Sequence, residues 1–356
     1  MSTKRDEMII AMKKRFFQKG IFAECILLLL AVSVYCSVPH IKNAQTSVSV
    51  AGETSPSPDK KYIKWVDFQV STAAMELASK YDIQTYGTPC HIDWISLLAY
   101  TAAKSGGSFG KEELATIKET AQSIEKGTVT IEELSKDLKY YSYYKEAYSA
   151  ALGGLIGTYE NADSTTAYGI KAYHPIAKTF PFSEYDDFGA SRSYGYKRNH
   201  LGHDMMAQVG TPVIAIESGT VEALGWNQYG GWRIGIRSFD KKRYYYYAHL
   251  RQNYPYQSDL TEGAAVTAGD VIGYVGRTGY STKENTNNIE VYHLHAGLEL
   301  IFDESQKDSN NEIWIDLYPI LRFLSDHQME VKKKDGTKEW YAVNPITDPL
   351  VKQNSQ

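Results

Sequence analysis

Two short motifs decide how this chain folds and what it binds: the pentapeptide His200–Asp204 (HLGHD) and the tripeptide His293–His295 (HLH). Side chains alternate between the two faces of an extended strand, so His200 and Asp204 can point to one side, as can His293 and His295. Two imidazoles and a carboxylate suit a catalytic zinc site, which takes three protein ligands and leaves a fourth position for water. The two motifs therefore predict a metal site assembled from distant parts of the chain.

Further segments accompany these motifs in a fixed order across residues 185–302. They are Gly210–Val213 (GTPV), Ala215–Ala223 (AIESGTVEA), Tyr247–Leu250 (YAHL) and Val266–Gly279 (VTAGDVIGYVGRTG). With the two histidine motifs, they resemble the lysostaphin-like (LytM-type) zinc metalloendopeptidases, which are bacterial cell-wall hydrolases. An ordered set of segments is a far more specific signal than one short motif.

The resemblance implies a site and an activity. His200, Asp204 and His295 are expected to bind one zinc ion per chain, with His249 and His293 as catalytic histidines beside it. Zinc lowers the pKa of water, and the two histidines would transfer its proton and support the developing oxyanion. The implied reaction is zinc-dependent hydrolysis of peptide bonds in bacterial peptidoglycan, in the stem or in the cross-bridge.

Two other functions stay open at the level of sequence. One is a catalytically silent or auxiliary scaffold that binds the cell wall and acts through protein partners. The other is an interaction protein whose helical unit binds an envelope protein, while the zinc domain remodels the wall locally. The complete set of predicted ligands and both additional histidines argue against the silent scaffold.

His203 departs from the pattern, since most members of the family carry an aliphatic residue at this place. Alternation along a strand directs it away from His200 and Asp204, toward the layer beneath or a neighbouring strand. We expect a buried, neutral histidine with a hydrogen-bond partner. The alternative is that it exchanges with His200 as a ligand.

Length and composition set the number of folded units and exclude some partners. A chain of 356 residues with 43% hydrophobic residues has room for two folded units with cores. The net charge of −4 gives no basic surface for nucleic acid. Cys25 and Cys36 lie in the apolar N-terminal stretch, which leaves only Cys90 in the folded region, so no disulfide framework is expected there.

The N-terminus predicts the compartment. Residues 1–19 are basic and are expected in the cytoplasm, and the apolar stretch 20–38 is long enough to cross a bilayer. A cleaved secretory signal is the competing interpretation, but no clear cleavage site follows. In both cases the rest of the chain is extracytoplasmic. Residues 39–60, rich in Ser, Thr and Pro, are expected to be a flexible linker.

The predicted fold class is α+β, with three parts after the linker. Residues 61–160 are expected to form a small helical domain of unknown role, because Asp93 can cap one helix and Thr130 with Glu133 form a capping box before another. Residues 161–326 contain short alternating runs and are expected to form the compact antiparallel β peptidase domain. Residues 327–356 form a C-terminal hairpin and tail, with Asp335-Gly336 at the turn.

The aromatic residues of the β part raise two further expectations. Tyr247 is expected to flank the site, because it lies two residues before His249. Trp226, Tyr229 and Trp232 surround a glycine pair and either line a substrate groove or pack locally. The stretch IWIDLYPILRFL after Asn311 is expected to be helical.

Overall fold

The computed structural model describes residues 62–193, 197–307 and 310–354. The predicted cytoplasmic segment 1–19, membrane segment 20–38 and linker 39–60 lie outside these ranges. Among the helices that the model does describe, none combines the length and apolar character needed to cross a bilayer.

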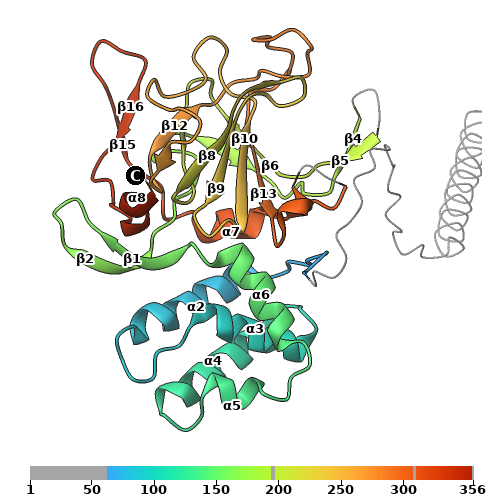
Figure 1. Cartoon of the computed structure of the whole chain (residues 1–356), viewed down its shortest axis with the longest axis vertical. Coiled ribbons are helices and arrows are strands. Elements are labelled where there is room, and N and C mark those ends of the chain that lie inside the picture. The colour runs from blue at the N-terminus through green and yellow to red at the C-terminus, as the bar shows by residue number, and fades with distance from the viewer. Residues whose placement is uncertain (1–61, 194–196, 308–309, 355–356) are drawn as a thin grey trace, which may run out of the picture. The chain divides into compact units, whose positions relative to one another are not determined.

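A cluster of helices forms the first part of the described chain (Figure 1). Their bounds are α2 (Thr72–Thr85), α3 (Trp94–Ser105), α4 (Lys111–Glu125), α5 (Ile131–Ser135) and α6 (Tyr141–Leu152). The predicted caps are confirmed: the carboxylate of Asp93 accepts from the Ser96 amide, and Thr130 and Glu133 form the capping box of α5. Helix α3 ends at Gly106, whose φ of 75° is a left-handed conformation that glycine adopts readily.

Strands make up most of the remaining chain. They are β1 (Ile156–Glu160), β2 (Thr166–Ile170), β3 (Phe182–Glu184), β4 (Ser191–Ser193), β5 (Lys197–Asn199), β6 (His203–Ala207), β7 (Pro212–Ile214), β8 (Gly219–Asn227), β9 (Gly231–Ser238), β10 (Arg243–Ala248), β11 (Ala265–Val266), β12 (Val271–Tyr274), β13 (Leu294–Leu300), β14 (Ile313–Ile315), β15 (Val331–Lys333) and β16 (Trp340–Ala342). Strand β1 begins inside the range 61–160, so the helical part itself ends at Leu152.

The largest sheet of the described residues has eight strands. Its order is β11-β8-β9-β10-β13-β6-β3, and β14 also pairs with β13. Each pair of named strands in it is antiparallel. The predicted antiparallel β part, accompanied by several helices, is thus what the structure contains.

The C-terminal region differs in one respect from expectation. The stretch predicted to be one helix splits into strand β14 and helix α7 (Tyr318–Phe323), because Ile313 to Ile315 complete the edge of the large sheet. The predicted hairpin is confirmed, since β15 and β16 pair across a turn at Gly336, which has a φ of 72°. Helix α8 (Pro349–Asn354) follows.

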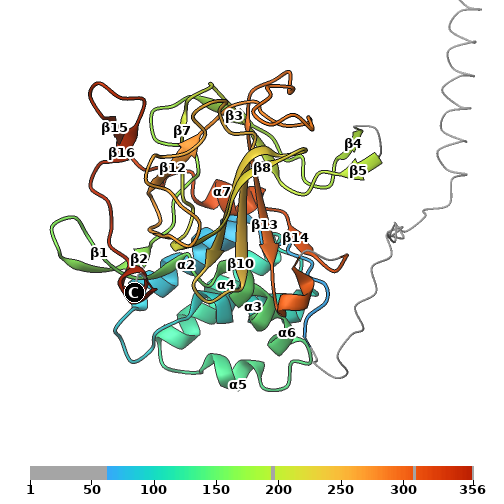
Figure 2. The ribbon, with the colours of Figure 1, turned by 45° about the horizontal axis from the view of Figure 1, so that its top comes forward.

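The helices lie together at one end of the sheet in both views (Figures 1 and 2). The two parts share one apolar core, to which Leu97 and Leu152 of the helices and Ile236 and Leu298 of the sheet all contribute. Burial of such side chains is the main favourable contribution to folding.

A buried arginine ties the last helix to the sheet. Arg243 at the start of β10 is only 1% exposed, and its Nη1 donates to the carbonyls of Ser149 and Ala150 near the end of α6. The same guanidinium forms an ion pair with Glu217, with 2.7 Å between Nε and Oε2. Because a buried charge is costly without partners, this pair requires α6 to stay against the sheet.

The Arg243–Glu217 pair yields a stability prediction. Glu217→Ala removes the buried partner of Arg243, and we expect the free energy of unfolding to fall by about 3 kcal/mol or more. Lys352→Ala breaks the exposed pair with Glu160 and is expected to cost about 1 kcal/mol at most. Chemical denaturation followed by circular dichroism measures both, and equal effects of the two variants would contradict a stabilising role for the buried pair.

Candidate metal centre and active-site groove

Strand pairing brings the two histidine motifs together. In β13, His295 lies directly opposite Asp204 of β6 on one side and Ala248 of β10 on the other. His293 immediately precedes β13, and His249 immediately follows β10. All five residues that the sequence singles out therefore meet at one end of three neighbouring strands.

A bend before β6 brings His200 to the same place. Residues 200–202 are not part of a strand, so His200 does not reach the site by simple alternation from Asp204. Gly202 stands within this bend, where an added Cβ would lie only 2.5 Å from Cε1 of His295 and 2.7 Å from the carbonyl oxygen of Ala296. The glycine of the HLGHD motif is thus required by close approach of the backbone to the His295 ring.

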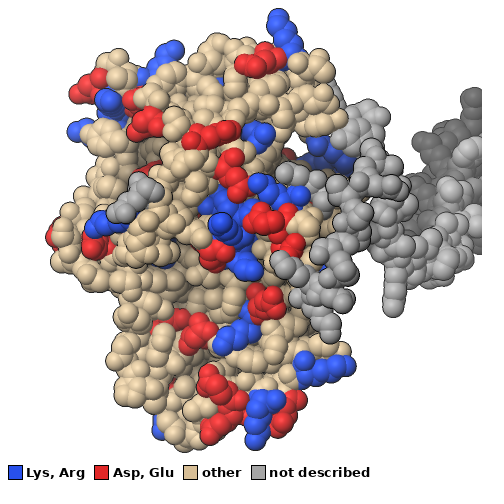
Figure 3. All heavy atoms as spheres, viewed as in Figure 1, with Lys and Arg blue, Asp and Glu red and all other residues tan. Residues whose placement is uncertain are grey.

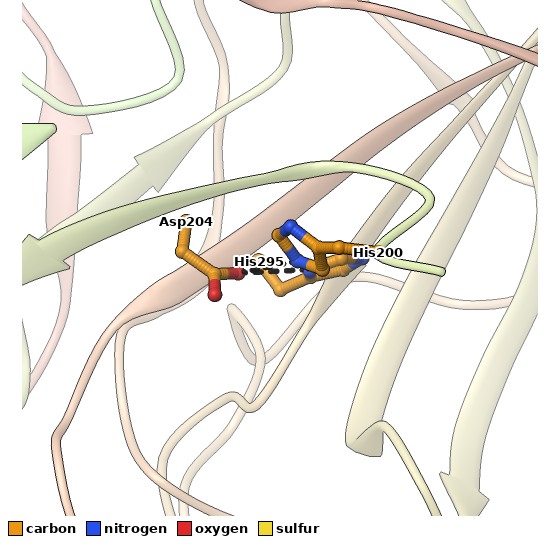
Figure 4. Close-up of side chains that lie close together, drawn as sticks. All are labelled: His200, Asp204 and His295. Atoms are coloured by element: carbon orange, nitrogen blue, oxygen red, sulfur yellow. Dashed lines mark hydrogen bonds and ion pairs between the residues drawn. The ribbon is translucent and has the colours of Figure 1, made fainter. Parts of the chain in front are cut away.

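The three predicted ligands converge on a single point (Figure 4). Nε2 of His200 lies 3.1 Å from Oδ1 of Asp204 and 3.0 Å from Nδ1 of His295, and Nδ1 of His295 lies 2.9 Å from the same carboxylate oxygen. All three side chains are largely buried. Among the described residues, this is the cluster of histidine and carboxylate groups that can hold a metal ion.

The donor set fits zinc. Two imidazoles and one carboxylate leave a fourth tetrahedral position open, as catalytic zinc sites do. Bonds of about 2.1 Å at tetrahedral angles put ligand atoms roughly 3.4 Å apart. The observed separations of 2.9 to 3.1 Å are within a few tenths of an ångström of that value.

Asp187 holds the first ligand, a role that sequence analysis did not identify. Nδ1 of His200 donates to the backbone carbonyl of Asp187 at 3.1 Å and lies 3.2 Å from its carboxylate. This leaves Nε2 of His200 as the atom directed to the metal position. Asp187 is thirteen positions before His200 and belongs to no motif, so only the folded chain identifies it.

The two additional histidines lie beside the cluster. The ring of His249 is 4.8 Å from that of His293 and 5.8 Å from that of His295, centroid to centroid. Each donates Nδ1–H to a backbone carbonyl, His249 to Thr278 at 3.0 Å and His293 to Val291 at 2.8 Å. The Nε2 atom of each is consequently left with a free lone pair.

The backbone at His249 turns its ring into the groove. Ala248 faces the groove, so a regular strand would point the next side chain into the core. His249 instead has a φ of 62°, in the left-handed region that non-glycine residues seldom adopt. Such strain persists at functional sites when surrounding contacts hold it.

Burial and neighbouring charges set the protonation states of the cluster. Burial alone would raise the pKa of Asp204, but hydrogen bonds with His200 and His295 hold it well below its usual range. Burial also opposes the charged form of His200, yet Asp187 and Asp204 raise its pKa to about 9. Burial lowers the pKa of His249 well below its ordinary value, and the nearby His293 and His295 lower it further. Asp204 is therefore ionised and His249 neutral at neutral pH.

A groove of about 940 Å³ runs over this end of the sheet. Besides the five site residues, it is lined by aromatic and charged side chains, among them Arg198, Tyr229, Arg233, Tyr244, Tyr246, Tyr280, Glu299 and Trp314. Trp226 and Trp232 pack edge to face against each other instead, with centroids 5.6 Å apart. Of the three aromatic residues near the glycine pair, Tyr229 is thus the one that lines the groove.

The prediction that Tyr247 flanks the site is wrong. Tyr247 is completely buried, and its hydroxyl accepts a hydrogen bond from the Ile216 amide. Alternation along β10 puts Tyr245 and Tyr247 in the core and Tyr244 and Tyr246 in the groove. Tyr246 is therefore the tyrosine nearest in sequence to His249 that faces the site.

His203 is buried as predicted, but it is not neutral. Its Nε2 lies 2.9 Å from Oε2 of Glu184, and its ring packs on Tyr318 with centroids 5.0 Å apart. Burial by itself lowers the pKa, but the carboxylates of Asp187 and Glu184 outweigh it and raise the pKa to about 9. His203 is therefore a cation that supports the carboxylates behind the metal site.

Comparisons with known proteins agree with this site. Residues 198–307 match the family described as Peptidase family M23. An L-Ala--D-Glu endopeptidase of Bacillus subtilis (strain 168) is 35% identical over 160 residues, which are 45% of this chain and 45% of that protein. Lysostaphin of Staphylococcus simulans is 40% identical over 84 residues, which are 23% of this chain and 16% of that protein. The chain thus spans less than half the length of these curated relatives.

The similarity to a solved structure extends beyond the matched domain. The crystal structure of a "putative glycyl-glycine endopeptidase lytM" from Ruminococcus gnavus is 26% identical and has a TM-score of 0.50. The superposed region covers 74% of this chain and 90% of the Ruminococcus gnavus chain. The shared fold therefore includes residues outside 198–307. Residues 198–307, in which His200, Asp204 and His295 converge, thus form a peptidase family M23 domain that is similar to those of lysostaphin-like (LytM-type) proteins.

Proposed function

We propose that this chain is a zinc-dependent endopeptidase that hydrolyses peptide bonds in bacterial peptidoglycan. The observation that carries the proposal is the convergence of His200, Asp204 and His295 on one point, with two more histidines beside it in an open groove. The name of the Bacillus subtilis relative, an L-Ala--D-Glu endopeptidase, supports peptide-bond hydrolysis.

The three metal ligands and the two additional histidines have separate roles in the proposed reaction. His200, Asp204 and His295 would hold zinc, which acts as a Lewis acid on the scissile carbonyl and on water. His249 is neutral and its Nδ1 is engaged by Thr278, so its Nε2 accepts the proton of the attacking water. His293, with Nδ1 held by Val291, presents its Nε2 on the same side of the groove. His293 receives on this Nε2 the proton that His249 took from water, supports the developing negative charge on the carbonyl oxygen as a cation, and then gives that proton to the leaving amine.

The proposal also places the peptidase domain on the outer side of the cell membrane. The basic residues before position 20 and the apolar stretch 20–38 support an anchor that leaves the peptidase domain on the outer side. Peptidoglycan lies on that side of the membrane. The anchor and the substrate are thus consistent with each other.

The first test is release of peptides from purified peptidoglycan sacculi. We expect the protein to lower the turbidity of sacculi and to expose new amino termini, because water attack on a peptide bond frees an amine. Chelation should abolish this release and added zinc should restore it. Mass spectrometry of the released peptides identifies the bond. If the protein binds zinc stoichiometrically and releases nothing from sacculi, the catalytically silent scaffold is the better interpretation.

Single substitutions separate metal binding from proton transfer. His295→Ala removes a ligand, so both bound zinc and turnover should be lost. His249→Ala removes the base, so zinc should stay bound while kcat falls by about 100-fold or more. His327→Ala is the matched control, because His327 lies outside the groove lining. Zinc content by elemental analysis and peptide cleavage are measured on the same samples, and full activity of either site variant would refute its assigned role.

A further inference from the structure

Arg233 stands out among the described arginines of the groove because its side chain has neither a carboxylate nor another side-chain acceptor as a partner. It lies on β9, lines the groove and is partly buried. Its Nε is shielded from water and has no hydrogen-bond partner within the described residues. None of the carboxylates in those residues comes within ion-pair distance of its guanidinium.

Neighbouring arginines are paired. Arg237, four positions further along β9, contacts Glu304 at 2.7 Å and Glu222 at 3.7 Å. Arg192 of β4 contacts Asp187 and also Asp204, the latter at 3.3 Å. Basic and acidic side chains are likewise interspersed over the face drawn in Figure 3. Arg198, which also lines the groove, has no carboxylate either, but it contacts the Tyr280 hydroxyl and lies over the Tyr280 ring. Within the described part of the groove, Arg233 is thus the arginine whose buried Nε has no acceptor.

An unpaired guanidinium in this position is costly to the folded chain. Arginine stays charged at any ordinary pH, so it cannot escape burial by losing its proton. A buried donor that lacks an acceptor loses its hydrogen bonds with water and receives none in return. The missing acceptor is accounted for if the groove receives an anion from outside the chain.

The register of the sheet puts Arg233 level with the metal site. Ile234 pairs with Tyr247 in β10, so the preceding residue, Arg233, is level with Ala248, which itself pairs with His295. Arg233 and His295 are thus two strands apart, about 10 Å from backbone to backbone. That distance corresponds to about three residues of an extended peptide.

Tyr244 and Tyr246 of the neighbouring strand β10 line the groove together with Arg233. Burial raises the pKa of both tyrosines, and the positive charge of Arg233 opposes the rise at each. Gly235, between Arg233 and Arg237 on the same face, leaves room for Tyr244 to lie across the strand. The Nε of Arg233 is shielded from water, and guanidinium–carboxylate hydrogen bonds are stronger where water is excluded.

The acidic residues of the groove lie further from the metal. Glu299 faces the groove four residues beyond His295 on β13, about 13 Å along the strand. Glu222 is neutralised by Lys307 and Arg237, and Glu312 accepts a hydrogen bond from Trp314. Among the described residues of the groove floor that are level with the metal site, Arg233 thus carries a charge that no carboxylate balances, which favours a negative charge on the substrate there.

We infer that Arg233 binds a carboxylate of the substrate peptide, carried within about three residues of the scissile bond. The preferred substrates are therefore acidic peptides, such as those that contain a free glutamate carboxylate, and not uncharged oligoglycine. Two N–H groups of the guanidinium fork match the two oxygens of a carboxylate. This inference rests on the proposed endopeptidase function.

A matched pair of substrates tests the inference. The peptides are L-Ala-γ-D-Glu-L-Lys-D-Ala-D-Ala, with the D-Glu α-carboxylate free, and the same peptide with that group as a carboxamide. Pentaglycine is the third substrate. The zinc-loaded full chain is compared with Arg233→Gln, Arg233→Lys and the control Lys283→Gln, which removes one positive charge from an exposed residue outside the groove.

We expect the unsubstituted protein to have a kcat/KM about 10- to 100-fold higher for the carboxylate peptide than for its carboxamide, and higher than for pentaglycine. Arg233→Gln should abolish this preference while changing cleavage of the carboxamide peptide by less than about threefold. Arg233→Lys should retain part of the preference, and Lys283→Gln all of it. Equal losses on both peptides in Arg233→Gln, or preference of the unsubstituted protein for pentaglycine, would overturn the inference.

Equilibrium binding separates this inference from the proposed function. Calorimetric titration of the two stem peptides into the full chain carrying His249→Ala measures affinity without cleavage. The carboxylate peptide should bind about 10- to 100-fold more tightly, and Arg233→Gln in the same background should remove the difference. If no peptide is cleaved but this difference is observed, the endopeptidase proposal fails and the carboxylate site stands. If both peptides bind equally, the carboxylate site is refuted even when cleavage occurs.

Discussion

The pairing of β13 with β6 and β10 is the constraint on which the site depends. His295 is opposite Asp204 in one neighbouring strand and Ala248 in the other, so a single register aligns residues from three distant segments. Because side chains alternate along a strand, a slip by one residue would turn His295 into the core and bring a leucine or an alanine to the groove. The core face of β13, with Leu294, Leu298 and Leu300 fully buried, opposes such a slip.

The same alternation separates packing from chemistry in β10. Tyr245 and Tyr247 are buried, and Tyr245 donates to Glu217, the partner of Arg243. Arg243 in turn contacts the end of α6, which keeps the helices on the core side of the sheet. Tyr244 and Tyr246 are left on the opposite face, where they line the groove. One strand thus joins the two parts of the chain and also forms part of the groove floor.

Behind the metal position, charge is balanced by Asp187 and Glu184, which no motif contains, and by His203 of the HLGHD motif. Asp187 orients His200, while the protonated His203 lies close to both Asp187 and Glu184. A cation between two carboxylates keeps both ionised, which in turn favours the orientation of His200 needed for a metal ligand. His203, the one departure from the family pattern within the HLGHD motif, is in this way part of the support of the site.

The residue types of the two motifs were enough to predict which side chains meet, because zinc chemistry restricts the ligands to few residue types. Strand alternation was the wrong reason for His200, which a bend before β6 brings to the site. Helix caps and the C-terminal hairpin were equally predictable, since they depend on residues close in sequence. Tertiary structure alone decided the left-handed turn at His249, the burial of Tyr247, the charge of His203 and the unpaired state of Arg233. Each of these depends on which distant groups surround a residue once the strands are paired, and a local sequence pattern contains no information about those neighbours.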